Sequence, residues 1–366
     1  MKIRKQTQLV IGQVLLITLG YVLINLFFYF QTSAIIFSPF SLGPSDLFDP
    51  DSFLLINVLV GIMAGLLGGT SLVLVNGRYF RKRSFGFALL TTAASYISIF
   101  WTVNLMAVFV RLSRQYGLGS ITYERFEAEW NLFFDATFLS NFILWGLISL
   151  FTLFLIQVND KFGPGILFKF LKGNYHQPKK EERIFMFMDM KSSTTIAEQL
   201  GNEQYFNLLN DVFADLTDTI LNHQGEIYQY VGDEIVICWP VKKGVKEANF
   251  IRCFMQVQAK LAELRPTYLA RYQVAPEFKA GIHYGEVMAG EVGVIKKDII
   301  YSGDVLNTTA RIQEQCKHYR VDLLISKTTF DLLQPEVAYK LDHLGKIELR
   351  GKQAKVEIGT IVNTPV

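Results

Sequence analysis

The chain has 366 residues, half of them hydrophobic, and its mean hydropathy of +0.25 is too high for an ordinary soluble protein. The formal net charge is only +3, and no run of Lys and Arg alternates with aromatic residues, so a nucleic-acid partner is not expected. The three cysteines, Cys238, Cys253 and Cys316, have neither CxxC spacing nor plausible metal-binding neighbours, which predicts reduced cytoplasmic thiols. The composition therefore indicates a membrane part joined to a globular part.

Four apolar stretches in the first half are long enough to cross a bilayer as helices, which takes roughly 20 residues. They run from about Leu9 to Phe30, Phe53 to Val75, Phe85 to Val110 and Leu132 to Val158. The first is too long for a cleaved signal peptide and no A-x-A site follows it, so we expect it to be retained. Residues 1–160 are therefore predicted to be a four-span transmembrane domain in contact with the lipid bilayer.

The distribution of basic residues predicts how these spans are oriented. Lys and Arg gather before the first span, between the second and third, and after the fourth, whereas the first outer loop carries Asp46, Asp49 and Asp51. By the positive-inside rule, both ends of the chain face the cytoplasm. We therefore expect a multi-pass protein of the cell (inner) membrane, with its N-terminus and its globular part in the cytoplasm.

The second span carries Gly61, Gly65 and Gly69 on one helix face, where another helix could approach closely. This face is expected either to pack within the four-helix bundle or to form a seam between two chains. The spans hold few ionisable residues, so a transporter is not favoured, and Asp135 near the outer end of the fourth is interpreted as interfacial.

Residues 161–182 are predicted to be a cytoplasmic linker. Gly163, Pro164 and Gly165 end the helix after the fourth span. The stretch from Leu167 to Lys172 then mixes apolar residues with lysines, which fits either a short amphipathic segment at the membrane surface or a plain linker.

The globular part, residues 183–366, alternates strand and helix patterns. Strands are expected at 183–188, 226–231 and 235–239, a strand pair around 278–292, and helices at about 202–221, 245–264 and 305–318. The order strand, helix, strand, strand, helix, strand predicts an α+β fold, a split βαβ sandwich of the ferredoxin-like type.

Two aspartates are candidates for binding metal ions. Asp189 comes at the end of the first predicted strand, and Asp233 follows Gly232 between two others. If the fold brings them together, they form a cradle for two divalent metal ions, as chemistry on a nucleoside triphosphate requires. Each taken alone also fits a structural role, since an Asp in a Gly-Asp turn is common.

Four motifs in this order and at these separations resemble the catalytic domain of class III nucleotidyl cyclases, the adenylyl and guanylyl cyclases of the membrane-anchored bacterial type. They are FMFMDMKSSTT, GEIYQYVGDEIV, AGIHYGEVMAGEVG and YSGDVLNTTARI, and they span nearly all of the globular part. The resemblance implies that a nucleoside triphosphate is converted to its cyclic 3′,5′-monophosphate and pyrophosphate, with two Mg²⁺ (or Mn²⁺) ions as cofactors.

The resemblance also implies roles for individual residues. Asp189 and Asp233 match the metal-binding aspartates, with the carbonyl of Met190 as a further ligand, and Asn307 and Arg311 match the pair that stabilises the transition state. The remaining residues are expected at the triphosphate: Ser192, Ser193, Thr194, and Arg350 or Lys352. Because the family builds its site from the metal half of one subunit and the Asn/Arg half of another, a homodimer is implied.

The chain departs from the family where the base is recognised. Gln229 stands where a lysine is usual, and Ile300 stands where Asp or Thr is usual. Gln229 can donate and accept hydrogen bonds, whereas the side chain of Ile300 can do neither. We expect ATP as the substrate, with GTP or a pyrimidine triphosphate as alternatives, and a catalytically silent membrane scaffold as the alternative of another class.

Overall fold

The structure is a computed structural model that describes residues 5–38, 49–73, 85–117, 119, 121–127, 136–162, 177–294, 297–333, 339–348 and 355–363. The chain divides near residue 168 into two compact units, and each unit is described by itself. Asp135 and the predicted amphipathic segment of the linker lie outside the described residues, and the predicted domain boundaries stay predictions.

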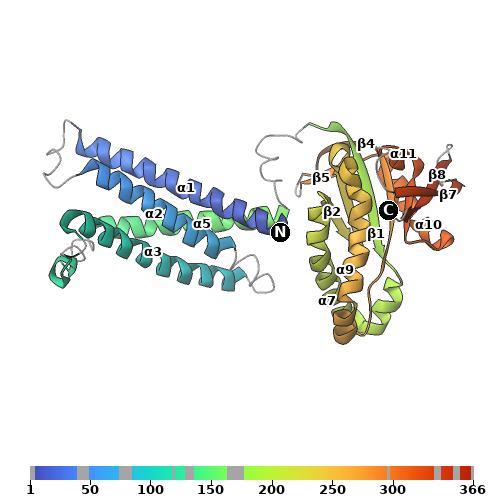
Figure 1. The fold of residues 1–366 in the computed structure, drawn as a ribbon, viewed down its shortest axis with the longest axis horizontal. Helices are drawn as coiled ribbons and strands as arrows, with labels where there is room; N and C mark the ends of the chain where they lie inside the picture. The colour runs from blue at the N-terminus through green and yellow to red at the C-terminus, as the bar shows by residue number, and fades with distance from the viewer. Residues whose placement is uncertain are drawn as a thin grey trace. The chain divides into compact units, whose positions relative to one another are not determined.

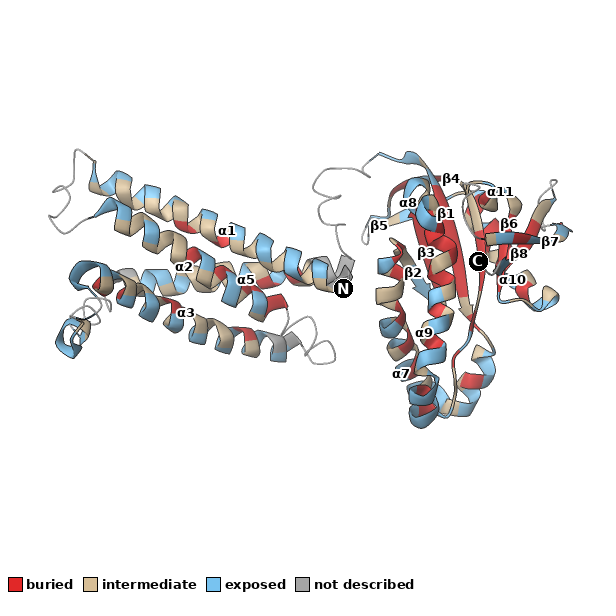
Figure 2. Cartoon of the chain, viewed as in Figure 1, coloured by how far each residue is buried: buried red, intermediate tan, exposed pale blue. Residues whose placement is uncertain are grey.

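The first unit contains four long helices, each including a stretch long and apolar enough to cross a membrane (Figure 1). Their bounds are α1 Lys5–Ile36, α2 Pro50–Thr70, α3 Phe85–Tyr116 and α5 Ala136–Phe162. Many of their large apolar residues are exposed, and pale blue marks the exposed residues along these helices in Figure 2. Apolar residues on the outside of a helix bundle are suited to lipid, so the predicted transmembrane bundle is supported by length, composition and exposure.

The glycine face of α2 packs against α1 of the same chain. A Cβ atom at Gly61 would lie 2.8 Å from the Cα of Val22, and one at Gly65 would lie 2.5 Å from the Cα of Thr18. Such distances are too short for a real side chain, so the two backbones approach closely only because glycine is present. Of the two interpretations of this face, packing within the bundle is the one that the structure supports.

The second unit is built around an eight-stranded mixed sheet with the strand order β2-β3-β1-β4-β6-β8-β7, and β5 pairs with β4. Only the β4–β6 pairing among these is parallel. The strands are β1 Lys179–Met190, β2 Glu226–Val231, β3 Glu234–Pro240, β4 Phe278–Val292, β5 Asp298–Ser302, β6 Leu323–Ser326, β7 Tyr339–Ile347 and β8 Val356–Asn363. The helices are α7 Ser193–Asn222, α8 Val241–Val245, α9 Asn249–Tyr272, α10 Asp304–Tyr319 and α11 Lys327–Phe330.

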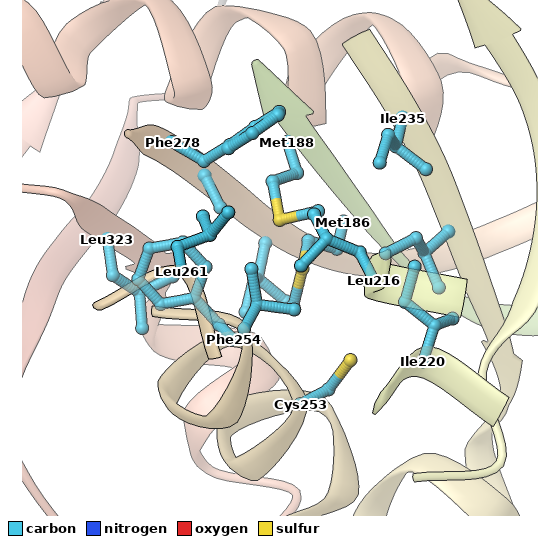
Figure 3. Packing of buried hydrophobic residues seen from close by; sticks show 14 of the residues in the cluster. Met186, Met188, Leu216, Ile220, Ile235, Cys253, Phe254, Leu261, Phe278 and Leu323 are labelled. Atoms are coloured by element: carbon cyan, nitrogen blue, oxygen red, sulfur yellow. The ribbon is translucent and has the colours of Figure 1, made fainter. Parts of the chain in front are cut away.

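Helices cover both faces of this sheet. Successive residues of β1 point to opposite faces of the sheet. Met186 and Met188 therefore enter the core shared with α7 and α9, whereas Phe185 enters a second core shared with α10. Figure 3 shows the first core, in which Leu216 of α7 and Phe254 of α9 lie close to the β1 methionines. The α+β class predicted from the order of elements is confirmed.

Three predicted elements differ from the observed ones. The segment 278–292 is one 15-residue strand, β4, and not a strand pair; its hairpin partner is β5. At Gly281 and Gly285 its backbone passes close beneath α10: a Cβ at Gly281 would collide with the backbone of Gln313, and one at Gly285 would crowd the side chain of Val305. The helix predicted at 202–221 is the second part of α7, which is interrupted at Gly201 (φ +74°), and α9 extends beyond its predicted end to Tyr272.

Candidate active site

The ends of three strands bring Asp189 and Asp233 together. Asp189 lies one residue before the end of β1, directly opposite Glu234, the first residue of β3. Asp233 lies in the two-residue turn between β2 and β3, which Gly232 makes possible with a positive φ of +60°. The β1–β3 register therefore places the two aspartates side by side, although 43 residues separate them in the sequence.

The surroundings of Asp233 fit a cation. Burial raises the pKa of this carboxyl above its ordinary value, and a hydrogen bond with Asp189 together with the charge of Asp189 raises it further, while the Ser193 hydroxyl partly opposes the shift. Its Oδ2 atom is buried and has no hydrogen-bond partner among the described residues. A buried acceptor beside a like charge is costly unless a cation satisfies it. The site therefore suits the divalent metal ions expected from the sequence.

Glu234 belongs to the same charged region. Burial raises its pKa to about 7, and the charges of Asp189 and Asp233 contribute, whereas Lys279 opposes the shift. The described residues contain no group of three or more His, Cys, Asp and Glu arranged to hold a metal. The two aspartates would therefore share a metal with backbone, phosphate or water oxygens, which is the usual environment of Mg²⁺ at phosphate sites.

Asp189 is held from two directions. Its Oδ2 accepts a hydrogen bond of 3.1 Å from Nε2 of Gln313 in α10, and it lies 3.3 Å from Nζ of Lys279 in β4. Neither residue was predicted to have a role. Lys279 could have been found only from the strand register, which pairs it with Asp189, and Gln313 only from its place two residues after Arg311.

The segment expected to bind phosphate starts α7. Ser192 adopts a left-handed conformation (φ +56°), α7 begins at Ser193, and no side chain caps its N-terminus. The first N–H groups of a helix lack partners within the helix and attract anions, so Ser192, Ser193 and Thr194 stay candidates. Lys191 turns away instead: its backbone N–H donates to the carbonyl of Glu277, and its Nζ lies 2.6 Å from Asp322.

Asn307 and Arg311 lie one turn apart on α10, as their spacing predicts. Asn307 is exposed and Arg311 is half-buried, whereas Gln313 is buried at 5% exposure. Because each residue turns an α-helix by about 100°, Arg311 and Gln313 leave α10 on nearly opposite sides. The helix thus directs Gln313, and not Arg311, toward the aspartates of its own chain.

The two positions expected to recognise the base lie beside a pair of contacting tyrosines. Gln229 is exposed and follows a bulge in β2, and Ile300 in β5 is 37% exposed. The rings of their neighbours, Tyr228 and Tyr301, have centroids 5.0 Å apart, and the backbone N–H of Tyr301 donates to the Tyr228 hydroxyl at 3.3 Å. The aromatic pair therefore connects the two strands that carry these positions.

A buried arginine supports the pair Tyr228 and Tyr301, and no sequence pattern indicated its role. Arg183, 4% exposed, donates to Glu181 at 2.8 Å and to Glu226 at 2.9 Å, and its guanidinium lies 4.6 Å from the centre of the Tyr301 ring. Burial lowers the pKa of Arg183, but Cys238, Tyr301 and Glu226 raise it by more. Arg183 therefore stays charged.

Two other features lie apart from the carboxylates. Arg350 and Lys352, expected at the triphosphate, fall outside the described residues. A cavity of about 620 Å³ opens between α9 and the strands β6 and β8, and its lining includes neither aspartate.

A family model described as the adenylate and guanylate cyclase catalytic domain matches residues 175–362, which is just over half of the chain. The chain belongs to this family. The four motifs that suggested class III cyclases all lie in the matched region.

Relatives of this family member include both adenylate and guanylate cyclases. Adenylate cyclase 2 of Rhizobium meliloti is 34% identical over 56% of this chain and 57% of its own length. Adenylate cyclase 1 of the same organism is 28% identical over 50% of this chain and 28% of its own length, and human retinal guanylyl cyclase 2 is 24% identical over 52% and 17%. The chain thus spans little more than half of the first relative and less of the others.

A solved structure shows the same fold. The structure of a bacterial light-regulated adenylyl cyclase superposes with a TM-score of 0.54 and 21% identity, covering 63% of this chain and 67% of that chain. At this identity the likeness supports the fold alone, and it confirms the cyclase type of α+β fold expected from the motifs.

Proposed function

We propose that this chain is a membrane-bound nucleotidyl cyclase that converts a nucleoside triphosphate to the cyclic 3′,5′-monophosphate and pyrophosphate, for second-messenger signalling. The observation that carries the proposal is the adjacent pair Asp189 and Asp233, with the unpartnered Oδ2 of Asp233, at the strand ends of a cyclase-family fold. In this reaction the ribose 3′-hydroxyl attacks the α-phosphate and pyrophosphate leaves, which forms the cyclic monophosphate.

In this proposal the two carboxylates and the carbonyl of Met190 would hold two Mg²⁺ or Mn²⁺ ions. When bound, such ions lower the pKa of the attacking hydroxyl and neutralise charge on the triphosphate. Asp189 is oriented for this role by Gln313, and Asp233 by the turn that follows Gly232. The backbone N–H groups of Ser192, Ser193 and Thr194, at the start of α7, would hold the phosphates.

Asn307 and Arg311 would orient the ribose and stabilise charge on the α-phosphate. Since α10 directs Gln313 toward its own aspartates and Arg311 to the other side, a second chain would supply the Asn/Arg pair. We therefore propose a homodimer with two equivalent sites, each shared between the subunits. Arg350 or Lys352 would contact the triphosphate.

ATP is the proposed substrate. The name of the Rhizobium meliloti relative, adenylate cyclase 2, supports this choice. The Gln229 amide would recognise the base by hydrogen bonds, and Ile300 would offer only an apolar contact. GTP and the pyrimidine triphosphates are the competing substrates.

We propose further that residues 1–160 anchor the enzyme in the cell membrane, with residues 161–182 as a linker and the catalytic domain, 183–366, in the cytoplasm. The four apolar helices support the membrane anchor, and the positive-inside rule supports the orientation.

The deciding experiment is an assay of the purified full chain with ATP, GTP, CTP and UTP, each with Mg²⁺ or Mn²⁺. Cyclic AMP as the main product supports the proposal, and another cyclic nucleotide corrects the substrate. No cyclic product from any of the four, from protein that is folded and dimeric, would leave the silent scaffold as the function.

Mixing two inactive variants tests whether the site is shared. Chains with Asp189→Ala and chains with Arg311→Ala should each be inactive, and their heterodimer should regain one working site of two. If heterodimers form and stay inactive, the two halves of the site do not come from different subunits.

A further inference from the structure

Gln313 is the buried side chain that joins α10 to the candidate metal site. Only 5% of the residue is exposed, and its Nε2 donates to Oδ2 of Asp189 at 3.1 Å. A buried amide with a charged acceptor makes one of the stronger hydrogen bonds in a protein. It lies on the side of α10 that faces the sheet.

Close backbone packing around Gln313 restricts the position of its side chain relative to Asp189. A Cβ at Gly281 would lie 2.7 Å from the Cα of Gln313, so β4 and α10 touch directly at this point. Eight residues earlier on the helix, which is about two turns, the side chain of Val305 packs on β4 at Gly285, where a Cβ would lie 3.1 Å from it. These two contacts fix the height of α10 above the sheet, and with it the origin of the Gln313 side chain.

The chemistry of the amide suits a support for a metal ligand. A neutral donor orients the carboxylate of Asp189 and leaves its negative charge for a cation, whereas the ammonium group of Lys279, 3.3 Å from the same oxygen, reduces that charge. Partners of metal ligands outside the coordination sphere set ligand orientation and, through it, metal affinity.

We propose that Gln313 is a positioning residue that fixes the carboxylate of Asp189 and thereby sets the affinity of the site for divalent metal ions. This inference rests on the proposed function only in taking Asp189 as a metal ligand. Gln313 acts within its own subunit, on the metal half of the site, although it shares α10 with the Arg311 that serves the other site of the dimer.

The test is direct binding of Mn²⁺ to the full-length protein in detergent, measured by the electron paramagnetic resonance signal of free Mn²⁺ without any nucleotide. Gln313→Met keeps the length of the side chain and removes the donor, so it should weaken Mn²⁺ binding by about 10- to 100-fold. In the cyclase assay the same variant should raise the half-saturating Mn²⁺ concentration by a similar factor, with turnover at saturating Mn²⁺ within about threefold of the wild type.

Gln258→Met is the matched control. The amide of Gln258, in α9, donates a hydrogen bond of 2.9 Å to the carbonyl of Phe278 in β4. It does so on the opposite face of the sheet from α10, where α7 and α9 pack. The substitution makes the same chemical change one strand away from Asp189 and should leave Mn²⁺ affinity as in the wild type. If both variants weaken Mn²⁺ binding equally, a general loosening of the domain explains the effect and the proposal is wrong.

Mixed dimers locate the effect. In a heterodimer of Arg311→Ala and Asp189→Ala chains, the Arg311→Ala chain supplies the metal ligands of the one working site. Gln313→Met should raise the half-saturating Mn²⁺ concentration when placed on that chain and should have no such effect on the other. Equal effects from both chains would mean that Gln313 acts through Arg311, which overturns the proposal.

The remaining outcomes are also decisive. Wild-type affinity in a folded Gln313→Met protein overturns the inference and leaves the proposed function intact. Mn²⁺ binding that depends on Gln313, in a protein that makes no cyclic nucleotide, overturns the proposed function and supports the inference. If Gln313→Met does not fold, Gln313→Asn, which keeps an amide one methylene shorter, should weaken binding in the same range.

Discussion

Replacing Gly281 by alanine would insert a methyl group at the point where β4 touches α10. The new Cβ would lie 2.7 Å from the Cα of Gln313 and closer still to its backbone nitrogen, whereas ordinary contact begins at 3.4 Å. Since a strand backbone and a helix backbone cannot rotate away as a side chain does, α10 would have to move outward by about 0.7 Å or more. Overpacking of this kind costs about 1–3 kcal/mol of the free energy of unfolding.

The same movement would reach the candidate active site. The bond from Gln313 to Asp189, 3.1 Å long, would stretch toward about 3.8 Å, which is too long for a hydrogen bond. Arg311 on the same helix would shift equally, and a displacement near 1 Å in a catalytic group can cost about 100-fold in rate. Gly281→Ala should therefore lower turnover far more than its stability loss suggests.

The assay combines thermal unfolding of the full chain in detergent with cyclase turnover below the unfolding transition. A loss of about 2 kcal/mol should lower the unfolding temperature of the catalytic domain by about 4–8 °C. Gly285→Ala is the graded comparison, because its Cβ would lie 3.1 Å from the side chain of Val305 and not from helix backbone, and Gly20→Ala, with nothing within 4 Å, is the neutral control. If Gly281→Ala unfolds and turns over like Gly20→Ala, the reasoning about the contact of α10 with β4 is refuted.

Three further predictions concern other buried groups. Asp233→Asn replaces the carboxylate whose Oδ2 lacks a partner by a neutral amide, so the metal-free protein should be stabilised by about 1 kcal/mol, while stabilisation by Mn²⁺ should disappear. Scanning fluorimetry with and without Mn²⁺ measures both effects, and a persisting Mn²⁺ effect would contradict the metal assignment. Arg183→Met leaves two carboxylates without their cation and removes the contact with Tyr301, so it should lower the free energy of unfolding in urea by about 3 kcal/mol. Arg183→Lys should recover only part of this loss. An unchanged free energy of unfolding in Arg183→Met would show that the buried cation is not needed. Burial raises the pKa of both Cys253 and Cys316 to about 12, so iodoacetamide at pH 8 should label neither thiol in the folded protein and both after denaturation, as mass spectrometry can measure; labelling of the folded protein would show that these positions open to solvent.

Periodicity and composition were sufficient for much of the architecture. Four apolar runs predicted the four long helices, since a membrane span is defined by length and hydropathy alone. The alternation in β1 and the spacing in α10 likewise depend on residues close together in the chain. The strand pair predicted at 278–292 was wrong because the segment is one long strand whose partner, β5, lies outside it, and a local strand pattern does not show where the partner of a strand lies.

For the candidate site, the sequence by itself determined which residues are candidates for the chemistry: two aspartates at strand ends, a helix start beside one of them, and an Asn/Arg pair one turn apart. Only the tertiary structure decided how they are grouped. The register of β1 with β3 and β4 brings Asp233 and Lys279 to Asp189, and the packing of α10 on Gly281 brings Gln313 to it while turning Arg311 away. Register and helix height depend on contacts between segments tens to more than a hundred residues apart, and no local pattern encodes them.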